Sequence, residues 1–183
     1  EGAPTATTLA MAVVVKVAVL AVAARIVADV FVDLDSREGA RGIGAILAIA
    51  AVLSVVVGNV GALRQQNIKR LLGYSAVAHA GYLCVALVSL PAYEASGDII
   101  VTYAVAYALG TTLVLLGLIM AGSEGAEAVH LADVRGLFFR SKVAAIAMAV
   151  GFATLLGLPL TPGFVAKLMV IRGAAQVDSA GLA

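Results

Sequence analysis

The chain has 183 residues, of which 62% are hydrophobic and 13% are charged, and its formal net charge is +1 at pH 7. Soluble domains carry about 25% charged residues, so this composition argues against a soluble enzyme, and it excludes a disordered chain, which needs low hydrophobicity. A net charge of +1 creates no long-range field that would hold nucleic acid, so no nucleic-acid partner is expected. The single cysteine, Cys84, cannot form an internal disulfide, a zinc site or an iron–sulfur cluster.

Long apolar segments predict membrane-spanning helices, because a helix needs about 20 apolar residues to cross a hydrocarbon core of about 30 Å. The first of five segments carries Lys16 inside its apolar run, and His79 interrupts the third. The fifth contains glycines and prolines that should break the helix between Gly157 and Gly163. The expected spans are residues 7–32, 42–63, 68–93, 99–122 and 142–177.

The predicted fold is an all-α, polytopic transmembrane helix bundle. Backbone polar groups in lipid must be paired within the protein, and the sequence lacks the alternation of a transmembrane barrel. We expect residues 1–183 to form a single membrane domain, and the first residue, a glutamate, suggests an internal piece of a larger protein. Small residues at helical spacing, such as Gly73, Ala76 and Ala80, are expected to let helices approach closely, although alanine is simply abundant here.

The basic residues predict how the bundle is oriented. Cytoplasmic loops of membrane proteins carry an excess of lysine and arginine. The connections after the second and fourth segments hold most of these cations and are therefore expected in the cytoplasm: Arg64, Lys69, Arg70, Arg135, Arg140 and Lys142.

Ionisable side chains within the predicted spans are the main functional signal. Lys16 lies near the bilayer centre, where a lysine costs about 2.5–3.5 kcal/mol on insertion scales, so it needs a partner or a water-filled cavity. His79 lies ten residues, or roughly 15 Å, beyond Lys69 along the third helix, and Ser75 and Tyr82 share its face. Histidine titrates near neutral pH, which suits a proton carrier.

Lys167 follows the predicted break by about one helical turn. Broken membrane helices survive only inside protein or beside a water cavity, and they recur at ion sites. Simpler interpretations also exist: a structural ion pair for Lys16, a hydrogen-bonded core histidine for His79, and an interfacial position for Lys167 or Lys69. Taken together, these protonatable groups at membrane depth indicate an ion pathway.

Four sequence blocks resemble the antiporter-like, proton-pumping membrane subunits of respiratory NADH:quinone oxidoreductase (complex I). They are Glu1-Gly2-Ala3-Pro4-Thr5 followed by Lys16, the stretch Arg64 to Ser75 with Ala78-His79-Ala80-Gly81-Tyr82, Leu131 to Leu137, and Gly157-Leu158-Pro159 through Gly163 to Lys167. The first block and the terminal lysine are most similar to the N-type subunits. Leu160 departs from the family pattern, which has a second proline there, and Pro162 stands immediately before Gly163.

The resemblance implies a proton-translocating subunit of a multi-subunit translocase, coupled to electron transfer in other subunits. Lys16 would connect two half-channels, Lys69 and His79 would belong to the cytoplasm-linked relay, and Lys167 would pass protons onward. Gly157, Pro159, Pro162 and Gly163 would form the helix break.

The same resemblance implies no catalytic redox site, metal or cofactor in this chain. NADH, FMN, iron–sulfur clusters and quinone are expected in partner subunits. The expected partners are other membrane subunits of complex I, the lipid bilayer, protons and water, and the expected location is multi-pass in the bacterial inner membrane. Two sister systems share much of the pattern, the Mrp-type cation/proton antiporters and the membrane-bound hydrogenases. A passive scaffold is a third interpretation.

Overall fold

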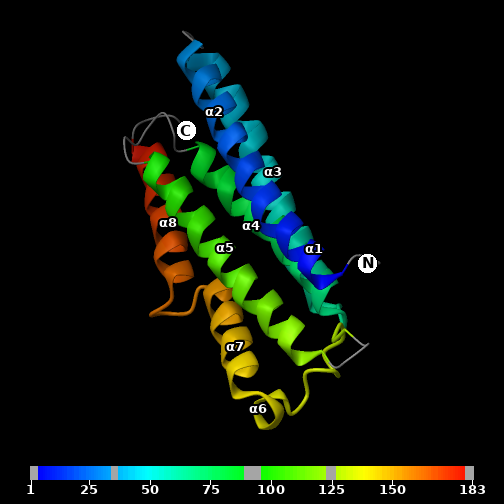
Figure 1. Ribbon diagram of the computed structural model, residues 1–183. Coiled ribbons are helices and arrows are strands. Elements are labelled where there is room, and N and C mark those ends of the chain that lie inside the picture. Colours follow the sequence, from blue (N-terminus) through cyan, green and yellow to red (C-terminus); the bar gives the residue numbers. More distant parts are fainter. Residues whose placement is uncertain (1–3, 34–36, 89–95, 123–126, 180–183) are drawn as a thin grey trace.

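The computed structural model describes residues 4–33, 37–88, 96–122 and 127–179, which form a bundle of helices (Figure 1). The first three residues of the Glu-Gly-Ala-Pro-Thr block lie outside the described residues, as do residues 34–36, 89–95, 123–126 and 180–183. In chain order the elements are α1 (Thr5–Ala10), the π-helix η1 (Met11–Val15), α2 (Lys16–Asp33), α3 (Arg37–Leu63), α4 (Ile68–Val88), α5 (Ser96–Ala121), α6 (Leu137–Arg140), α7 (Lys142–Leu156) and α8 (Pro162–Ser179).

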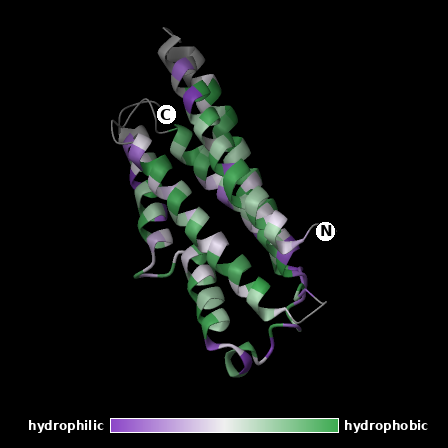
Figure 2. Cartoon of the chain, in the orientation of Figure 1, coloured by the Kyte–Doolittle hydropathy of each residue, from purple (hydrophilic) through white to green (hydrophobic). Residues whose placement is uncertain are grey.

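The prediction of an all-α polytopic bundle is confirmed. Within the described residues, four helical segments are long and apolar enough to cross a membrane: Thr5–Val27, Gly42–Leu63, Ile68–Val88 and Gly97–Ala121. The shorter apolar helix α7 ends at Leu156 and α8 begins at Pro162, so the last segment is interrupted where the glycines and prolines predicted it. Hydrophobic residues cover most of the helical surface in Figure 2, and hydrophilic residues concentrate toward the ends.

A π-helical turn in the first span was not predicted. Residues Met11–Val15 form a π-helix between α1 and α2, and Lys16 follows it directly. Such wide turns are rare and often lie at functional sites. The apolar sequence around Lys16 contains no proline or glycine that would have signalled this turn.

Two helix pairs, α3 with α4 and α5 with α7, pack closely because small residues face each other. A Cβ atom at Gly81 would lie 2.7 Å from the carbonyl oxygen of Ala51, and one at Gly151 would lie 2.7 Å from that of Gly110. The spacing that suggested Gly73 as a contact residue does not correspond to such an approach, because nothing lies within 4 Å of a Cβ added there. The close contacts between helices therefore involve Gly81 and Gly151, and not Gly73 as the sequence spacing suggested.

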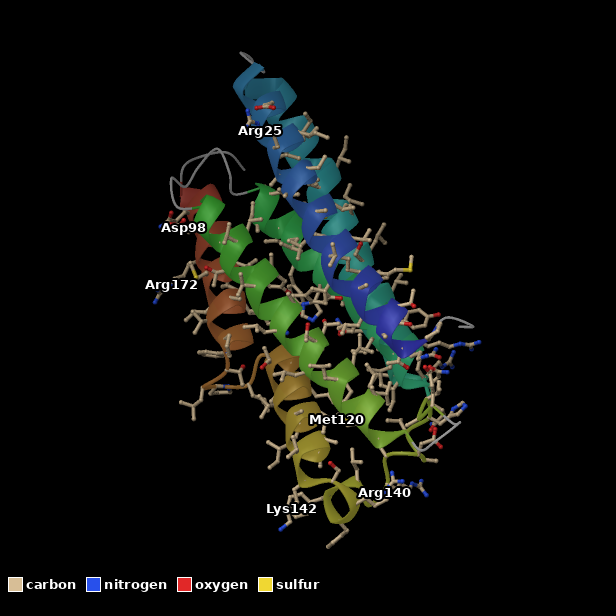
Figure 3. The ribbon with its side chains drawn as sticks, in the orientation of Figure 1. Arg25, Asp98, Met120, Arg140, Lys142 and Arg172 are labelled. Atoms are coloured by element: carbon tan, nitrogen blue, oxygen red, sulfur yellow. The ribbon has the colours of Figure 1, made fainter. Side chains whose placement is uncertain are left out.

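The two basic connections lie at the same end of the bundle. The backbone N–H of Ile68 donates to the carbonyl of Val129 at 2.8 Å, and that of Leu131 donates to the carbonyl of Gln66 at 2.9 Å. Figure 3 places Arg140 and Lys142 at this end and Arg25, Asp98 and Arg172 toward the other. The arrangement agrees with the expectation that both basic loops face one side of the membrane.

The buried core has two apolar clusters along α5, and the polar site lies between them. One cluster surrounds Leu115 and includes Tyr107, and the other surrounds Ile99 and includes Tyr103. Tyr103 and Tyr107 are one helical turn apart, so their hydroxyl groups introduce polar atoms at the junction of the two clusters.

Candidate proton-relay site

Three of the four predicted relay side chains meet in the middle of the bundle. Lys16 comes from the start of α2, His79 from α4 and Lys167 from α8, and each contacts a tyrosine. Helix α8 packs against both α4 and α5, while the first span packs along α5, and this arrangement gathers the three residues.

His79 is a buried histidine with a tyrosine partner. Its side chain is only 7% exposed, and its Nδ1 atom lies 2.7 Å from the hydroxyl oxygen of Tyr103, which is itself 2% exposed. The imidazole ring also lies 4.9 Å from the ring of Tyr107 and 6.1 Å from that of Tyr82, measured between centroids. Three aromatic rings therefore surround the histidine and hold its position.

Lys16 finds its partner on α5. Its Nζ atom donates a hydrogen bond of 2.9 Å to the hydroxyl oxygen of Tyr107, and it lies 5.2 Å from the centre of that ring. A lysine within an apolar helix must offset the loss of hydration, and a hydroxyl acceptor together with the electron-rich ring face does so in part.

Lys167 binds the end of the helix that precedes the break. Its Nζ atom donates to the carbonyl oxygens of Leu155 and Leu156 at 3.2 and 2.9 Å. The last carbonyls of a helix lack partners within the helix and carry partial negative charge. The Lys167 ammonium supplies hydrogen-bond donors and a positive charge to these carbonyls at the end of α7. The same Nζ atom lies 5.0 Å from the centre of the Tyr82 ring.

The break itself follows from four residues that sequence reasoning selected. Gly157 ends α7 with φ of 77°, the left-handed conformation that glycine adopts freely, and Pro159 lies in the turn that follows. Pro162 is the first residue of α8, a position where its missing N–H costs nothing. Gly163 lies directly against the backbone of Thr154, so a side chain would not fit between α8 and α7.

Two cavities adjoin His79 and Lys167. The smaller, of about 10 Å³, lies among His79, Tyr103, Tyr107 and Lys167, and it offers room for about one water molecule. The larger, of about 150 Å³, extends from His79 and Lys167 past Ser75 to Asn59. The polar side chains that reach each cavity, among them His79 and Lys167, could bind water that would connect the protonatable groups.

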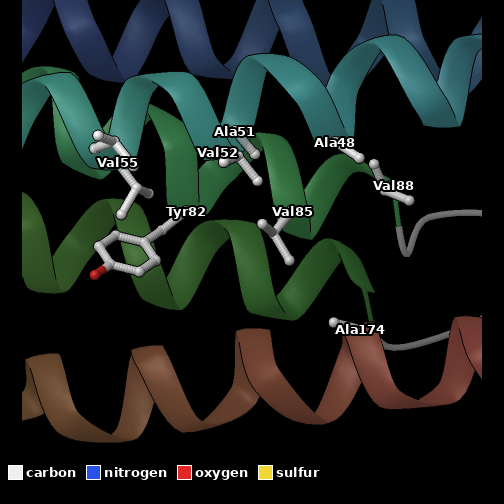
Figure 4. Close-up of a pocket in the computed structure, with 9 residues that line it drawn as sticks. Ala48, Ala51, Val52, Val55, Tyr82, Val85, Val88 and Ala174 are labelled. Carbon is white, nitrogen blue, oxygen red and sulfur yellow. The ribbon is translucent and has the colours of Figure 1, made fainter.

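A third cavity has a different character. A groove of about 430 Å³ lies along α3 and α4 and is lined almost wholly by alanine and valine, as Figure 4 shows. Tyr82 lines this groove and also the cavity that contains Ser75. The Tyr82 ring therefore separates an apolar groove from the polar interior.

Lys69, the fourth predicted residue, does not join this cluster. It lies at the start of α4, ten residues before His79, and its Nζ atom donates to Glu127 Oε2 at 2.7 Å. Glu127 also accepts hydrogen bonds from the backbone N–H of Thr5 at 2.9 Å and from its hydroxyl at 3.0 Å. The hydrogen bond from Lys69, followed by those from Thr5, lowers the pKa of Glu127 from 4.5 to about 2. Glu127 therefore joins α1, α4 and the loop before α6.

Tyr103, Tyr107 and Glu127 were not predicted as site residues from the sequence. A signal for the tyrosines was present, since Tyr103, Tyr107 and Thr111 recur every four residues and form a polar stripe on an otherwise apolar helix. Glu127 lies in the connection before α6, where no helical spacing relates it to Lys69 or Thr5. Among the described residues, no group of three or more histidine, cysteine, aspartate or glutamate side chains could hold a metal ion.

Comparison with known proteins identifies the family. The description "NADH:quinone oxidoreductase/Mrp antiporter, TM" matches across residues 1–183. The chain belongs to this family. It is 39% identical over 175 residues to NADH-quinone oxidoreductase subunit N 1 of Sorangium cellulosum (strain So ce56), an alignment that covers 95% of this chain and 34% of the relative.

A second relative carries the same subunit name. NADH-quinone oxidoreductase subunit N of Acinetobacter baumannii (strain AB0057) is 45% identical over 133 residues, which cover 70% of this chain and 26% of that protein. This family member therefore spans about a third or less of the length of the curated relatives it matches. Both relatives agree with the resemblance to N-type subunits seen in the sequence.

Proposed function

We propose that this chain is part of a proton-translocating membrane subunit of NADH:quinone oxidoreductase, of the N type, in a bacterial inner membrane. The observation that carries the proposal is the cluster of Lys16, His79 and Lys167, three protonatable side chains gathered at one level of a membrane bundle and connected through tyrosines. All three side chains can gain and lose a proton, and their proximity at membrane depth favours a relay that exchanges protons over isolated structural charges.

The protons would move between Lys16 and Lys167 by way of His79 and the water that its two cavities can hold. Lys69 would lie at the cytoplasmic mouth of this relay, because it stands at the end that carries the basic loops. Its ammonium group is held there by Glu127, which keeps a positive charge near the start of α4.

The chemistry that drives this movement would occur elsewhere. NADH oxidation, FMN, iron–sulfur clusters and quinone reduction would belong to partner subunits, and other membrane subunits of the complex would pack against this one within the lipid bilayer. A change of charge or position in those partners would alter the electrostatic balance among the two lysines and the histidine.

The test uses the full-length subunit in its native assembly. Lys16→Met and Lys167→Met are introduced separately. The matched control is Lys142→Met, because Lys142 is the exposed first residue of α7. Proton uptake by inverted membrane vesicles is measured during NADH oxidation. We expect each of these two substitutions to lower the rate of proton uptake by about tenfold, while the control retains it.

Three results would argue for other functions. Normal assembly with unchanged proton uptake in both variants would indicate a scaffold. An assembly that lacks NADH:quinone activity but exchanges a metal cation for protons would indicate an Mrp-type antiporter. Proton uptake driven by hydrogen oxidation would indicate a membrane-bound hydrogenase.

A further inference from the structure

The three protonatable side chains of the relay are separated by tyrosine hydroxyl groups. Lys16 donates to Tyr107, and His79 contacts Tyr103 at 2.7 Å, while its ring lies 4.9 Å from that of Tyr107. Both tyrosines are buried on α5, one helical turn apart. These two neighbouring hydroxyl groups of α5 therefore contact Lys16 on one side and His79 on the other.

We propose that the Tyr107 hydroxyl conducts protons between Lys16 and the cavity beside His79, and that Tyr103 is a positioning residue that determines which nitrogen of His79 exchanges protons. This inference rests on the proposed function, because it names the groups through which the same relay operates.

Tyr107 can conduct a proton because a hydroxyl group accepts and donates at once. Its oxygen accepts from the Lys16 ammonium, so its own proton is directed elsewhere, and the cavity of about 10 Å³ that Tyr107 shares with His79 has room for about one water acceptor. When Lys16 transfers a proton to this oxygen, its N–H bond breaks and the electron pair stays on nitrogen. The original hydroxyl proton leaves to the acceptor in the cavity. One O–H bond forms as one breaks, and the tyrosine remains neutral.

Tyr103 acts through His79 and not on the moving proton directly. Because its hydroxyl occupies Nδ1, only Nε2 remains to exchange protons with the two cavities that His79 lines. In the neutral ring, a hydroxyl that donates to Nδ1 requires the proton on Nε2. Tyr103 is fully enclosed, so its ring and hydroxyl hold one orientation of the imidazole.

The experiment substitutes single hydroxyl groups in the full-length subunit of the native complex. Tyr107→Phe and Tyr103→Phe each remove one oxygen and keep the ring, and Tyr74→Phe, on the exposed side of α4, is the matched control. Proton uptake per NADH oxidised is measured in inverted vesicles between about pH 6 and pH 9, because this range includes neutral pH. Assembly of the complex is checked in each variant.

We expect Tyr107→Phe to lower proton uptake per NADH by about tenfold, and Tyr74→Phe to leave it unchanged. Tyr103→Phe should keep part of the uptake but shift its pH profile, because His79 would then exchange through either nitrogen while Lys16, Lys167 and Tyr82 still face it. Unchanged uptake in Tyr107→Phe, alongside a loss in Lys16→Met, would overturn the inference and leave the proposed function standing. Unchanged uptake in Lys16→Met as well would instead overturn the proposed function.

A second variant keeps the test decisive if Tyr107→Phe fails to assemble. Replacing Tyr107 by 3,5-difluorotyrosine preserves the hydroxyl and nearly the same volume but makes the phenol more acidic. If this hydroxyl conducts the proton, the pH profile of proton uptake shifts toward lower pH. A profile that coincides with that of the unmodified protein would overturn the role of Tyr107.

Discussion

The Nζ atom of Lys167 donates a hydrogen bond of 2.9 Å to the carbonyl oxygen of Leu156, the last residue of α7. The proposed relay would give this lysine a second role, which can be separated from the structural one. It supplies a donor and a positive charge to the unpaired end of a helix, and it carries a proton that the relay would release. A side chain that keeps the charge but never gives up the proton should preserve the first function and abolish the second.

Lys167→Arg and Lys167→Met distinguish these functions. Arginine keeps the charge and the donors but stays protonated, so we expect normal assembly with strongly reduced proton uptake. Methionine removes the donor from the carbonyls of Leu155 and Leu156, and we expect the bundle to lose about 1.5–3 kcal/mol of stability as well. The measurements are the apparent melting temperature of the purified complex and vesicle proton uptake. Native uptake in Lys167→Arg would show that Lys167 does not release its proton.

Gly163 sets how closely the two halves of the broken helix approach. A Cβ atom there would overlap the carbonyl oxygen of Thr154, so Gly163→Ala must separate α8 from α7. Because Lys167 lies on α8 and bonds to α7, we expect both assembly and proton uptake to decrease, with a stability loss of about 1–3 kcal/mol.

The matched control for this change is Gly73→Ala on α4. No atom lies within 4 Å of a Cβ added at Gly73, and alanine favours the helix over glycine by about 1 kcal/mol. The control should therefore match or slightly exceed the native melting temperature. Equal melting temperatures for Gly163→Ala and the native protein would contradict the tight contact.

Leu160 stands where the family pattern has its second proline, and its backbone conformation differs from that of a proline. It has φ of 76°, a left-handed conformation that costs a residue with a side chain about 1–2 kcal/mol, and its side chain is fully exposed. Proline cannot adopt this conformation, because its ring holds φ near −65°. The turn in this chain therefore differs from one with a second proline.

Substitutions at Leu160 test this difference. Leu160→Gly should raise the melting temperature, because glycine relieves the backbone strain and no buried contact is lost. Leu160→Pro should lower it, since the turn between Pro159 and Pro162 would have to change. A stable Leu160→Pro variant with native proton uptake would show that the break tolerates both turn geometries.

Much of the fold and part of the site could be predicted from the sequence, for physical reasons that also explain the failures. Apolar length determines where helices cross, and two prolines with two glycines determine where one breaks. The distance of Lys16 and His79 from the nearest loops indicates membrane depth, because a helix rises by a fixed amount per residue. These quantities depend only on the chain itself.

Contacts between helices could not be obtained in this way. The pairing of Lys16 with Tyr107 depends on how the first span is rotated against α5, and the unpredicted π-turn just before Lys16 changes that rotation. Likewise, the spacing of Gly73, Ala76 and Ala80 identifies a helix face but not the partner, and the close approach of α4 to α3 uses Gly81 instead. Rotation and pairing come from the packing of the whole bundle.

The carboxylate of Glu127 makes the basic end of the bundle sensitive to acid. Its pKa is lowered from 4.5 to about 2, first by the hydrogen bond from Lys69 and then by those from Thr5. A group whose pKa is lower in the folded protein contributes stability above its unfolded pKa and loses it as pH falls toward the folded value. The native protein should therefore lose this contribution between about pH 4.5 and pH 2.

The test compares the pH dependence of melting for the native protein, Glu127→Gln and Asp133→Asn. Asp133 is a second loop carboxylate whose pKa is lowered, first by the backbone hydrogen bond from His130 and then by that from Val129. We expect Glu127→Gln to be less stable than the native protein at pH 7 and to approach it as pH falls below 4.5, about where a free glutamate titrates. Asp133→Asn removes a different carboxylate of the same loop and leaves the contact between Lys69 and Glu127 intact. It is therefore the control for the loss of a negative charge from this loop. The melting curves of Glu127→Gln and the native protein would contradict this expectation if they ran parallel from pH 7 down to about pH 3, well below the pKa of a free glutamate. Parallel curves would show that the contacts of Glu127 with Lys69 and Thr5 do not stabilise this end.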